Sequence, residues 1–297
     1  MTNKERNAKF AKARQAAARR MTAIQRDTMG ELRRLLGQAD RDIAALLAGQ
    51  PSDFALWQLT GIRKSIARAM ADLGDGLAGA GGTGMGKSWT AGIELVDRPL
   101  EAGGIRLAGL APEIDTAQLV AMRSFMTDRM RDVGVKIAGR INSEIGLVAI
   151  GAKTPFEAIE AVAGLIEGGT GRATTIVRTE LGRAFSVAGQ ARMEQASALL
   201  PGLKKQWRRS GKTHSREAHD LADGQVVGVD EPFTINGASL MFPRDPAGPA
   251  QETINCGCTT LPFMESWEVA QPGRHPFSDD EVRLNPKKRD LADALDG

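Results

Sequence analysis

Two histidines and two cysteines in the C-terminal half have the chemistry of metal ligands. His214 and His219 lie five positions apart, and Cys256 and Cys258 are separated by one residue. Imidazole nitrogen and thiolate sulfur are the usual ligands of tetrahedral Zn²⁺, so these four residues suggest a structural zinc site. The alternative is a buried Cys-x-Cys segment with His219 hydrogen-bonded nearby, since a straight helix would not place both histidines on one face. A disulfide across a single residue would be badly strained.

The same residues could be drawn as a catalytic site. A cysteine nucleophile needs an imidazole within hydrogen-bond reach, which Cys256, His219 and Asn255 could supply. A metal-dependent nuclease could instead use His219, Asn255 and Asp245. Because the spacing selects neither arrangement, we assign no catalytic residue and expect a protein that is not an enzyme.

Residues Gly81 to Ser88 match the phosphate-binding loop GxxxxGK[ST]. That loop needs a buried strand before it and a helix after it, so that backbone N–H groups meet the phosphates. The preceding Asp72–Ala78 cannot form a buried strand. We therefore predict a flexible glycine-rich loop over 74–88 and no bound nucleotide, with Lys87 as the residue that a nucleotide-dependent alternative would use.

Positive charge is concentrated in two segments. Residues 1–26 carry eight Lys and Arg against Glu5 alone, and residues 201–216 carry six with no acid. Such clusters can neutralise DNA phosphates without reading sequence, or can simply form a solvated helix face. In the second segment the candidate DNA contacts are Lys204, Lys205, Arg208 and Arg209. Trp207 between them is expected to anchor the core rather than stack on a base.

Composition favours helices. Aromatic residues make up 4% of the 297 residues and tyrosine is absent, so the core must consist mainly of Ala, Leu, Ile, Val and Met. No apolar run approaches the roughly 20 residues that cross a bilayer, and the N-terminus lacks the apolar stretch of a secretory signal. We expect a protein that begins in the cytoplasm and does not bind membranes.

Hydrophobic spacing predicts helices over 4–48, 53–73, 115–149, 155–171 and 172–199, with a break allowed at Gly134 or Gly139. After Pro201, short apolar pieces at 225–229, 233–235 and 239–242 predict strands. The expected fold class is α+β, with a predominantly helical N-terminal region and a small C-terminal α+β module. The predicted divisions are a basic amphipathic helical segment (1–50), a helical region with the glycine-rich loop (51–200), the module (201–264) and an extended tail (265–297).

The order of five elements within 165–262 resembles the phage head morphogenesis family typified by the F protein of phage Mu. In that family an R-T-E triplet precedes a W…R-x-x-H…G segment, a P-x-D-P turn and a final N-C-x-C. The matching residues are Arg178, Thr179, Glu180, Trp207, Arg216, His219, Gly224, Pro243, Asp245, Asn255, Cys256 and Cys258. Two positions depart from the pattern: Lys212 stands near an expected Asp, and Gly257 stands where Arg is frequent.

The resemblance implies a minor capsid protein, present in few copies inside the virion head and in the host cytoplasm during assembly. It would bind the portal protein and the major capsid or scaffold protein, and would assist procapsid assembly, DNA packaging or ejection. Packaged DNA would be contacted non-specifically. Some family members carry a fused enzyme domain, and we expect none here because little sequence follows the N-C-x-C motif. Apart from the candidate structural zinc, no cofactor is expected.

Overall fold

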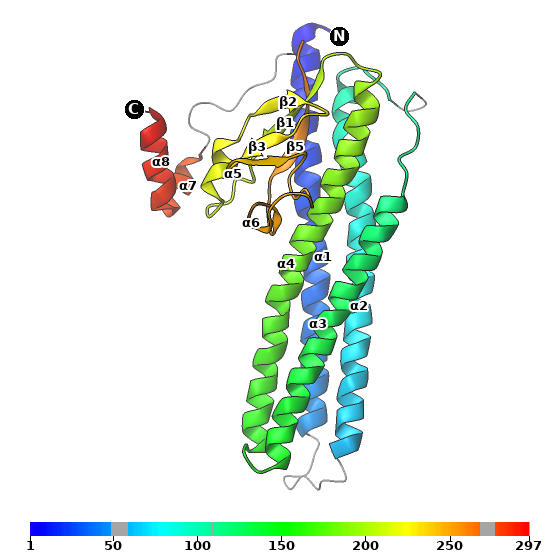
Figure 1. Ribbon diagram of the computed structural model, residues 1–297, viewed down its shortest axis with the longest axis vertical. Coiled ribbons are helices and arrows are strands. Elements are labelled where there is room, and N and C mark those ends of the chain that lie inside the picture. The colour runs from blue at the N-terminus through cyan, green and yellow to red at the C-terminus, as the bar shows by residue number, and fades with distance from the viewer. Residues whose placement is uncertain (49–58, 108–109, 268–276, 297) are drawn as a thin grey trace. The chain divides into compact units, whose positions relative to one another are not determined.

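The structure is a computed structural model that describes residues 1–48, 59–107, 110–267 and 277–296 (Figure 1). The helices are α1 (Asn3–Ala48), α2 (Leu59–Ala102), α3 (Ala117–Ala149), α4 (Pro155–Ser197), α5 (Glu217–Leu221), α6 (Ala250–Thr253), α7 (Asp279–Leu284) and α8 (Pro286–Asp296). The strands are β1 (Leu203–Arg208), β2 (Val226–Gly228), β3 (Phe233–Ile235), β4 (Ala238–Leu240) and β5 (Thr259–Met264). The predicted fold class, α+β with a helical N-terminal region, is confirmed.

The chain divides into two compact units, which we name the mixed unit and the helical unit. The mixed unit comprises Met1–Ile24, Lys87–Thr116 and Leu181–Gly297, and the helical unit comprises Gln25–Gly86 and Ala117–Glu180. Helices α1, α2 and α4 each contribute to both units. The compact unit that holds the strands therefore extends well beyond the predicted range 201–264.

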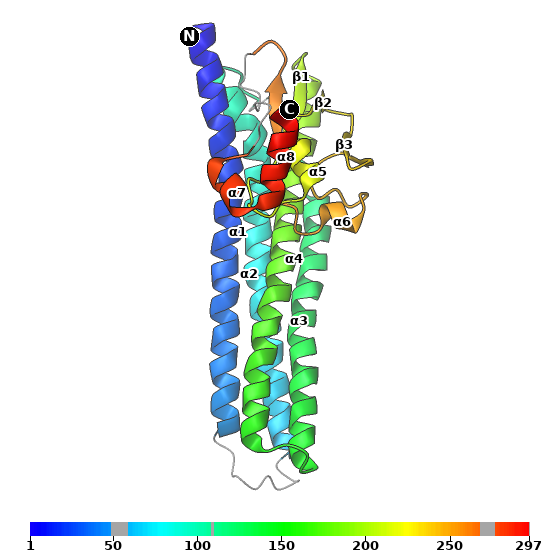
Figure 2. The same cartoon turned by 90° about the vertical axis from the view of Figure 1, so that its left-hand side faces the viewer.

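The helical unit consists of segments of α1, α2, α3 and α4 that lie side by side in both views (Figures 1 and 2). Each segment buries apolar residues three or four positions apart, which makes one continuous apolar face per helix. On α3 this face is formed by Met126, Met130, Val133, Ile137, Ile141 and Ile145. The prediction of a helix over 115–149 is confirmed, and α3 continues without a break through Gly134 and Gly139.

The glycine-rich stretch 74–88 is helical, so its prediction as a flexible loop was wrong. It lies inside α2, where its glycines allow neighbouring helices to approach closely. A Cβ at Gly81 would lie 2.7 Å from the Cε atom of Met126 on α3, and one at Gly74 would lie 3.3 Å from the Arg131 Cα. Backbone N–H groups inside an α-helix bond to carbonyls four residues earlier. Residues 81–88 therefore do not form the phosphate cradle that their sequence matches.

The continuity of α4 contradicts a second predicted helix boundary. Glycines 168, 169 and 171 were expected to end one helix before another began at 172, but α4 is continuous from Pro155 to Ser197. A Cβ at Gly169 would lie 2.7 Å from the Cδ1 atom of Ile137 on α3. Close packing between helices thus explains this glycine too, where sequence alone indicated a helix end.

The mixed unit holds a three-stranded antiparallel sheet of order β2-β1-β5 and the hairpin β3-β4 (Figure 1). Lys205 at the centre of β1 is in register with Val227 on one side and Pro262 on the other. Strands β2, β3 and β4 confirm the predicted strands at 225–229, 233–235 and 239–242.

The start of α1 is part of the core of the mixed unit. The ring of Phe10 meets the ring of Trp267 edge to face at a centroid distance of 4.7 Å, and the guanidinium of Arg6 lies 4.9 Å from the centroid of the Trp267 ring. Arg14, which is also buried, donates a hydrogen bond to the Gln206 side chain in β1. Residues far apart in sequence therefore build one core.

The described residues 277–296 of the predicted extended tail are largely helical, so the prediction was wrong for them. Helix α7 begins with a capping box, in which Ser278 accepts from the Glu281 N–H and the Glu281 carboxylate accepts from the Ser278 N–H. Pro286 is the first residue of α8, a position where the missing N–H costs nothing. Pro272 and Pro276, which also suggested an extended arm, lie outside the described residues.

Among the helices of the described ranges, none combines the length and the apolar character needed to cross a membrane.

Alanine substitutions in the helical unit test the role of its glycines. A Cβ at Gly134 would lie 2.5 Å from the backbone oxygen of Met70, so Gly134→Ala should lower the free energy of unfolding by about 1–3 kcal/mol. Gly79 in α2 has open space around its Cα, and Gly79→Ala should raise stability by about 0.5–1 kcal/mol because alanine favours helix. Urea unfolding measures both. A neutral Gly79→Ala would contradict the helical assignment of this stretch.

Candidate functional site

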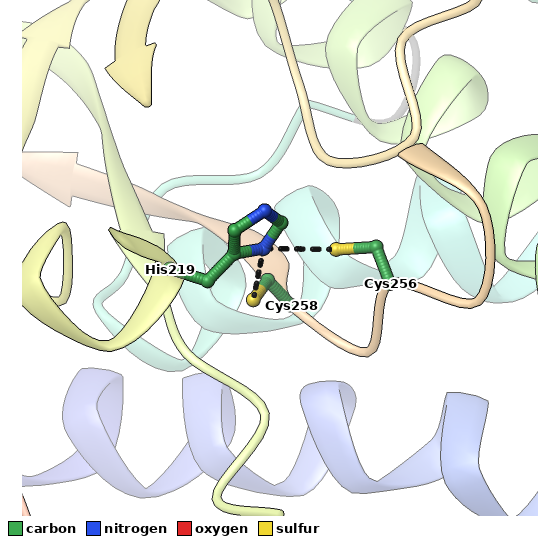
Figure 3. A group of neighbouring side chains, drawn as sticks. All are labelled: His219, Cys256 and Cys258. Carbon is green, nitrogen blue, oxygen red and sulfur yellow. Dashed lines mark hydrogen bonds between the residues drawn. The ribbon is translucent and has the colours of Figure 1, made fainter. Parts of the chain in front are cut away.

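His219, Cys256 and Cys258 converge in the interior of the mixed unit (Figure 3). Helix α5 carries His219, and the two cysteines directly precede β5. All three side chains are buried, with exposures of 2%, 3% and 2%. The Nδ1 atom of His219 lies 3.5 Å from the sulfur of Cys256 and 3.5 Å from the sulfur of Cys258. Within the described residues, this is the group of His, Cys, Asp or Glu side chains close enough to hold a metal ion.

The other ring nitrogen of His219 is fixed by a carboxylate. Its Nε2 atom lies 2.8 Å from an oxygen of Glu252 on α6, and both residues are buried. The second oxygen of Glu252 accepts a hydrogen bond of 3.2 Å from the Asn236 side-chain amide in the β3-β4 turn. A carboxylate on one ring nitrogen sets the tautomer and leaves the lone pair on the other, here Nδ1.

Arg244 fixes the Cys-x-Cys backbone. Its guanidinium donates to the carbonyl oxygens of Cys256 (2.6 Å) and Cys258 (2.9 Å), and to the Ser186 hydroxyl of α4 (3.1 Å). Gly182 on α4 leaves room for this side chain, because a Cβ there would lie 2.6 Å from the Nε atom of Arg244. The sequence pattern singled out Pro243 and Asp245 and missed Arg244, which occupies the variable position between them.

The two thiols affect each other. A hydrogen bond between them lowers the pKa of Cys256 well below its usual value, and the same bond, together with burial, raises the pKa of Cys258. Both cysteines are free thiols in this structure. The arrangement therefore offers sulfur and nitrogen donors without a disulfide.

His214 does not join this cluster, so its prediction as a fourth ligand was wrong. It is exposed and precedes α5, whereas His219 points inward from that helix. Asp245, drawn as a nuclease residue, accepts backbone N–H bonds from Met241 (2.8 Å) and Ala247 (2.9 Å) through its two oxygens. Its carboxylate therefore shapes a turn.

Trp207 is a core residue, as predicted. Its side chain is fully buried, and its ring lies 5.6 Å from the His219 ring and 5.3 Å from the Phe233 ring, edge to face in both cases. Together with Ile235, Leu240 and both cysteines it forms one apolar cluster. The candidate site is therefore part of a hydrophobic core.

The predicted DNA contacts at positions 204–209 are not available as a group. Lys205 is fully buried, donates to the Met241 carbonyl at 2.8 Å, and burial lowers its pKa to about 8. The Arg209 side chain is 7% exposed and bonds to both carboxylate oxygens of Glu281 at 2.6 and 2.7 Å. The prediction was wrong for these two residues, because strand alternation and the docking of α7 turn them inward. Lys204 and Arg208 pair with Glu265 and Asp223 at 2.9 and 2.7 Å.

The other motif residues whose contacts are described support the fold. Gly224 has φ +86°, which favours glycine, and donates its N–H to the Trp207 carbonyl at 2.9 Å. Arg216 donates to the Ile254 carbonyl at 2.8 Å, and Asn255 has φ +56°. The triplet Arg178-Thr179-Glu180 belongs to α4 in the helical unit, where Thr179 and Glu180 are buried.

The two positions that depart from the family pattern are neighbours in space. A Cβ at Gly257 would lie 2.9 Å from the Cε atom and 3.1 Å from the Nζ atom of Lys212. The Lys212 ammonium also donates to the Asn255 carbonyl at 3.3 Å. Lys212 and Ser210, whose Cβ atom would lie 2.8 Å away, therefore occupy the space that a larger side chain at position 257 would need.

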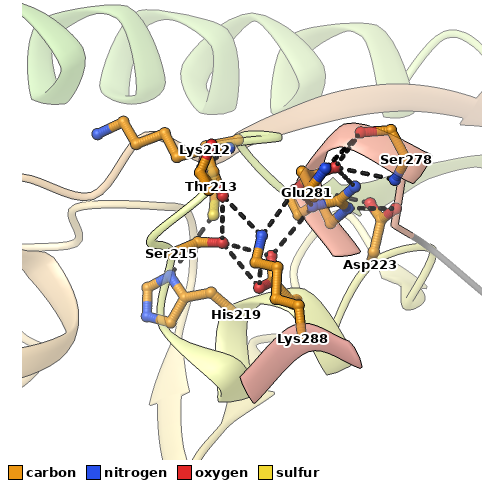
Figure 4. Close-up of polar contacts among 12 residues, drawn as sticks. Lys212, Thr213, Ser215, His219, Asp223, Ser278, Glu281 and Lys288 are labelled. Carbon is orange, nitrogen blue, oxygen red and sulfur yellow. Dashed lines mark hydrogen bonds and ion pairs between the residues drawn. The ribbon is translucent and has the colours of Figure 1, made fainter. Parts of the chain in front are cut away.

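An ionic cluster joins α7 and α8 to this region (Figure 4). Glu281 receives hydrogen bonds from Arg209 and from Lys288 (2.6 Å), and Ser215 donates to the buried Asp220 at 2.7 and 2.8 Å. Burial acts to raise the pKa of Glu281, but the hydrogen bonds from Arg209 and Lys288 outweigh it and hold that pKa well below its usual range. The charges come from distant segments, so no local spacing in the sequence revealed this cluster.

Comparison with known proteins agrees with these motifs. The family described as phage Mu protein F like protein matches residues 151–261, so the resemblance is confirmed over this segment. A protein named NAD(+)–arginine ADP-ribosyltransferase EFV, from Enterococcus faecalis, is 43% identical over 94 residues, which are 32% of this chain and 19% of that protein. The uncharacterized protein YqbB of Bacillus subtilis is 43% identical over 99 residues, 32% of each chain.

The chain thus spans less than a third of the length of these relatives. No solved structure matches it significantly. At the level of the family, the matched segment indicates phage head morphogenesis.

Replacing Arg244 with lysine tests its role. Lysine keeps the charge but lacks the planar fork that reaches both carbonyls, so at least one buried acceptor loses its partner. We expect Arg244→Lys to lower the free energy of unfolding by about 1–3 kcal/mol. The matched control is Arg19→Lys on the exposed face of α1, which should change stability by less than about 0.5 kcal/mol. Equal effects in urea unfolding would contradict the role given to Arg244.

Proposed function

We propose that this chain is a minor capsid protein of a tailed phage or prophage, and that it acts in head morphogenesis by binding other virion proteins. The observation that carries the proposal is the family match over 151–261, which includes every motif residue from Arg178 to Cys258. The partners we propose are the portal protein and the major capsid or scaffold protein, and the proposed location is the interior of the virion head.

The placement of the motif residues supports binding through the surface rather than chemistry at the motif. His219, Cys256 and Cys258 are almost entirely buried, and Gly224 and Asp245 shape turns. Such residues maintain the fold of the module. The exposed surface of the module remains available to binding partners. We therefore propose that assembly, packaging or ejection depends on adhesion, and that this chain is not an enzyme.

The start of α1 offers a basic face for packaged DNA. Lys4, Lys9, Lys12 and Arg19 are exposed, and at about 100° per residue they fall within one half of the helix circumference. Glu5, the acidic residue among the first 24, is exposed on the same side of the helix, where its carboxylate accepts a hydrogen bond from the Thr2 N–H. Cations arranged in this way bind phosphates without reading base sequence. We propose this face as the DNA contact in place of the buried Lys205 and Arg209.

Co-purification tests the assignment to head assembly. The full chain, carrying an affinity tag, is co-expressed with the portal and major capsid proteins encoded beside it, and bound proteins are identified by mass spectrometry. We expect the portal protein to be retained after washing in high salt. Retention of no virion protein would contradict the proposal. So would transfer of ADP-ribose from labelled NAD⁺ to an arginine substrate, the activity named for the Enterococcus relative.

The DNA contact is tested by fluorescence anisotropy with a labelled duplex at several salt concentrations. The double variant Lys9→Ala, Lys12→Ala should bind more weakly and should reduce the slope of log affinity against log salt by about 2, because each lost phosphate contact removes about 1. The control is Arg63→Ala, Lys64→Ala, which removes two exposed cations from α2 in the helical unit. Equal losses in both double variants would contradict a specific basic face on α1.

A further inference from the structure

The positions of His219, Cys256 and Cys258 are those of ligands around one cation. Zinc binds thiolate sulfur at about 2.3 Å and imidazole nitrogen at about 2.0–2.1 Å, so a tetrahedral angle separates sulfur from nitrogen by about 3.5–3.6 Å. The Nδ1 atom of His219 lies 3.5 Å from each of the two sulfurs. All three ligand atoms lie within 4.8 Å of one another.

Both sulfurs face the same ring nitrogen of His219, an arrangement that a shared cation would explain. The Glu252 carboxylate holds the proton of His219 on Nε2, so Nδ1 presents a single lone pair in the plane of the ring. One lone pair can accept one thiol hydrogen, yet two sulfurs stand at the same distance from it. A cation at the centre would bind the lone pair and both sulfurs at once.

The surroundings are those of a metal site. Metal-ligating histidines usually donate their second N–H to a carboxylate or carbonyl, which orients the ring and raises its basicity. Glu252 takes this position, and Asn236 orients Glu252 in turn. On the cysteine side, Arg244 bonds the carbonyls of both ligand residues and so fixes the loop that carries the sulfurs.

The charges also balance. Zn²⁺ and two thiolates sum to zero, and buried Arg244 and Glu252 carry opposite charges. Buried charge is tolerated in proteins when it is compensated in this way. Two sulfurs and one nitrogen are a donor set suited to zinc, and they disfavour the hard cations Mg²⁺ and Ca²⁺, which take oxygen ligands.

We propose that His219 Nδ1 and the Sγ atoms of Cys256 and Cys258 bind one Zn²⁺ ion. The ion joins α5 to the segment before β5, next to the hydrogen bonds His219–Glu252 and Arg216–Ile254. Its role is structural, and it is independent of which virion protein the chain binds.

Cobalt substitution of the full chain tests the site. The protein is stripped of metal with a chelator under reducing conditions, shown by circular dichroism to remain folded, and titrated with Co²⁺. We expect one equivalent to produce a thiolate-to-cobalt charge-transfer band, which Zn²⁺ then removes. Elemental analysis of the protein as purified should give about one zinc per chain. Zinc should also raise the Tm of the stripped protein and slow alkylation of both cysteines.

Variants separate ligands from neighbours. Cys258→Ser should remove the charge-transfer band that one equivalent of Co²⁺ produces in the unmodified chain. Glu252→Gln should weaken metal binding about 10–100-fold, because Glu252 is the carboxylate that orients the histidine ligand. His214→Ala is the matched control, because His214 is exposed and lies outside the cluster; it should bind metal like the unmodified chain. Absence of the band in the folded, unmodified chain would overturn the proposal, as would purification with copper in place of zinc or an effect of His214→Ala equal to that of Cys258→Ser.

Discussion

A buried guanidinium is the interaction on which the C-terminal module depends. Arg244 is 2% exposed, so its charge must be met by acceptors inside the protein. The acceptors are the carbonyls of Cys256 and Cys258 and the hydroxyl of Ser186 on α4. One side chain thus joins the P-x-D-P turn, the Cys-x-Cys segment and the long helix, and Gly182 is the position on α4 that makes room for it. Moving any of these parts would remove an acceptor from this buried charge.

This constraint gives the family motif a physical meaning. Gly224 and Asn255 adopt positive φ, and Asp245 closes a turn through two backbone N–H groups. Trp207 fills the core beside His219. The motif therefore specifies how a small sheet, two short helices and several tight turns fit together. A segment that is 43% identical also occurs in the Enterococcus relative, where it makes up 19% of a longer protein.

Sequence reasoning was accurate where local pattern decides structure. The apolar period of α3, the short strands β2 to β4 and the inward position of Trp207 followed from spacing and composition. It failed where a distant neighbour decides. The glycines of α2 indicated a loop because glycine destabilises a helix. The structure shows that these glycines let α3 pack closely against α2, and this packing offsets the loss. The sequence suggested that Lys205 and Arg209 are surface charges, but the pairing of β1 and the packing of α7 bury both side chains. Glu252 and Arg244 follow no motif spacing, so the support of the His-Cys cluster could not be foreseen.

The edge-to-face contact of Phe10 with Trp267 has a consequence for synthesis of the protein. The ribosome releases the first turns of α1 long before it releases the tryptophan that completes their core. The helical unit, whose segments end at Glu180, contains everything it needs earlier. Contacts of such large sequence separation form slowly, because a long loop must close before they stabilise anything. The nascent chain therefore carries a basic, partly apolar N-terminal segment without its final packing partner, and the mixed unit is the last part of the molecule to complete its core.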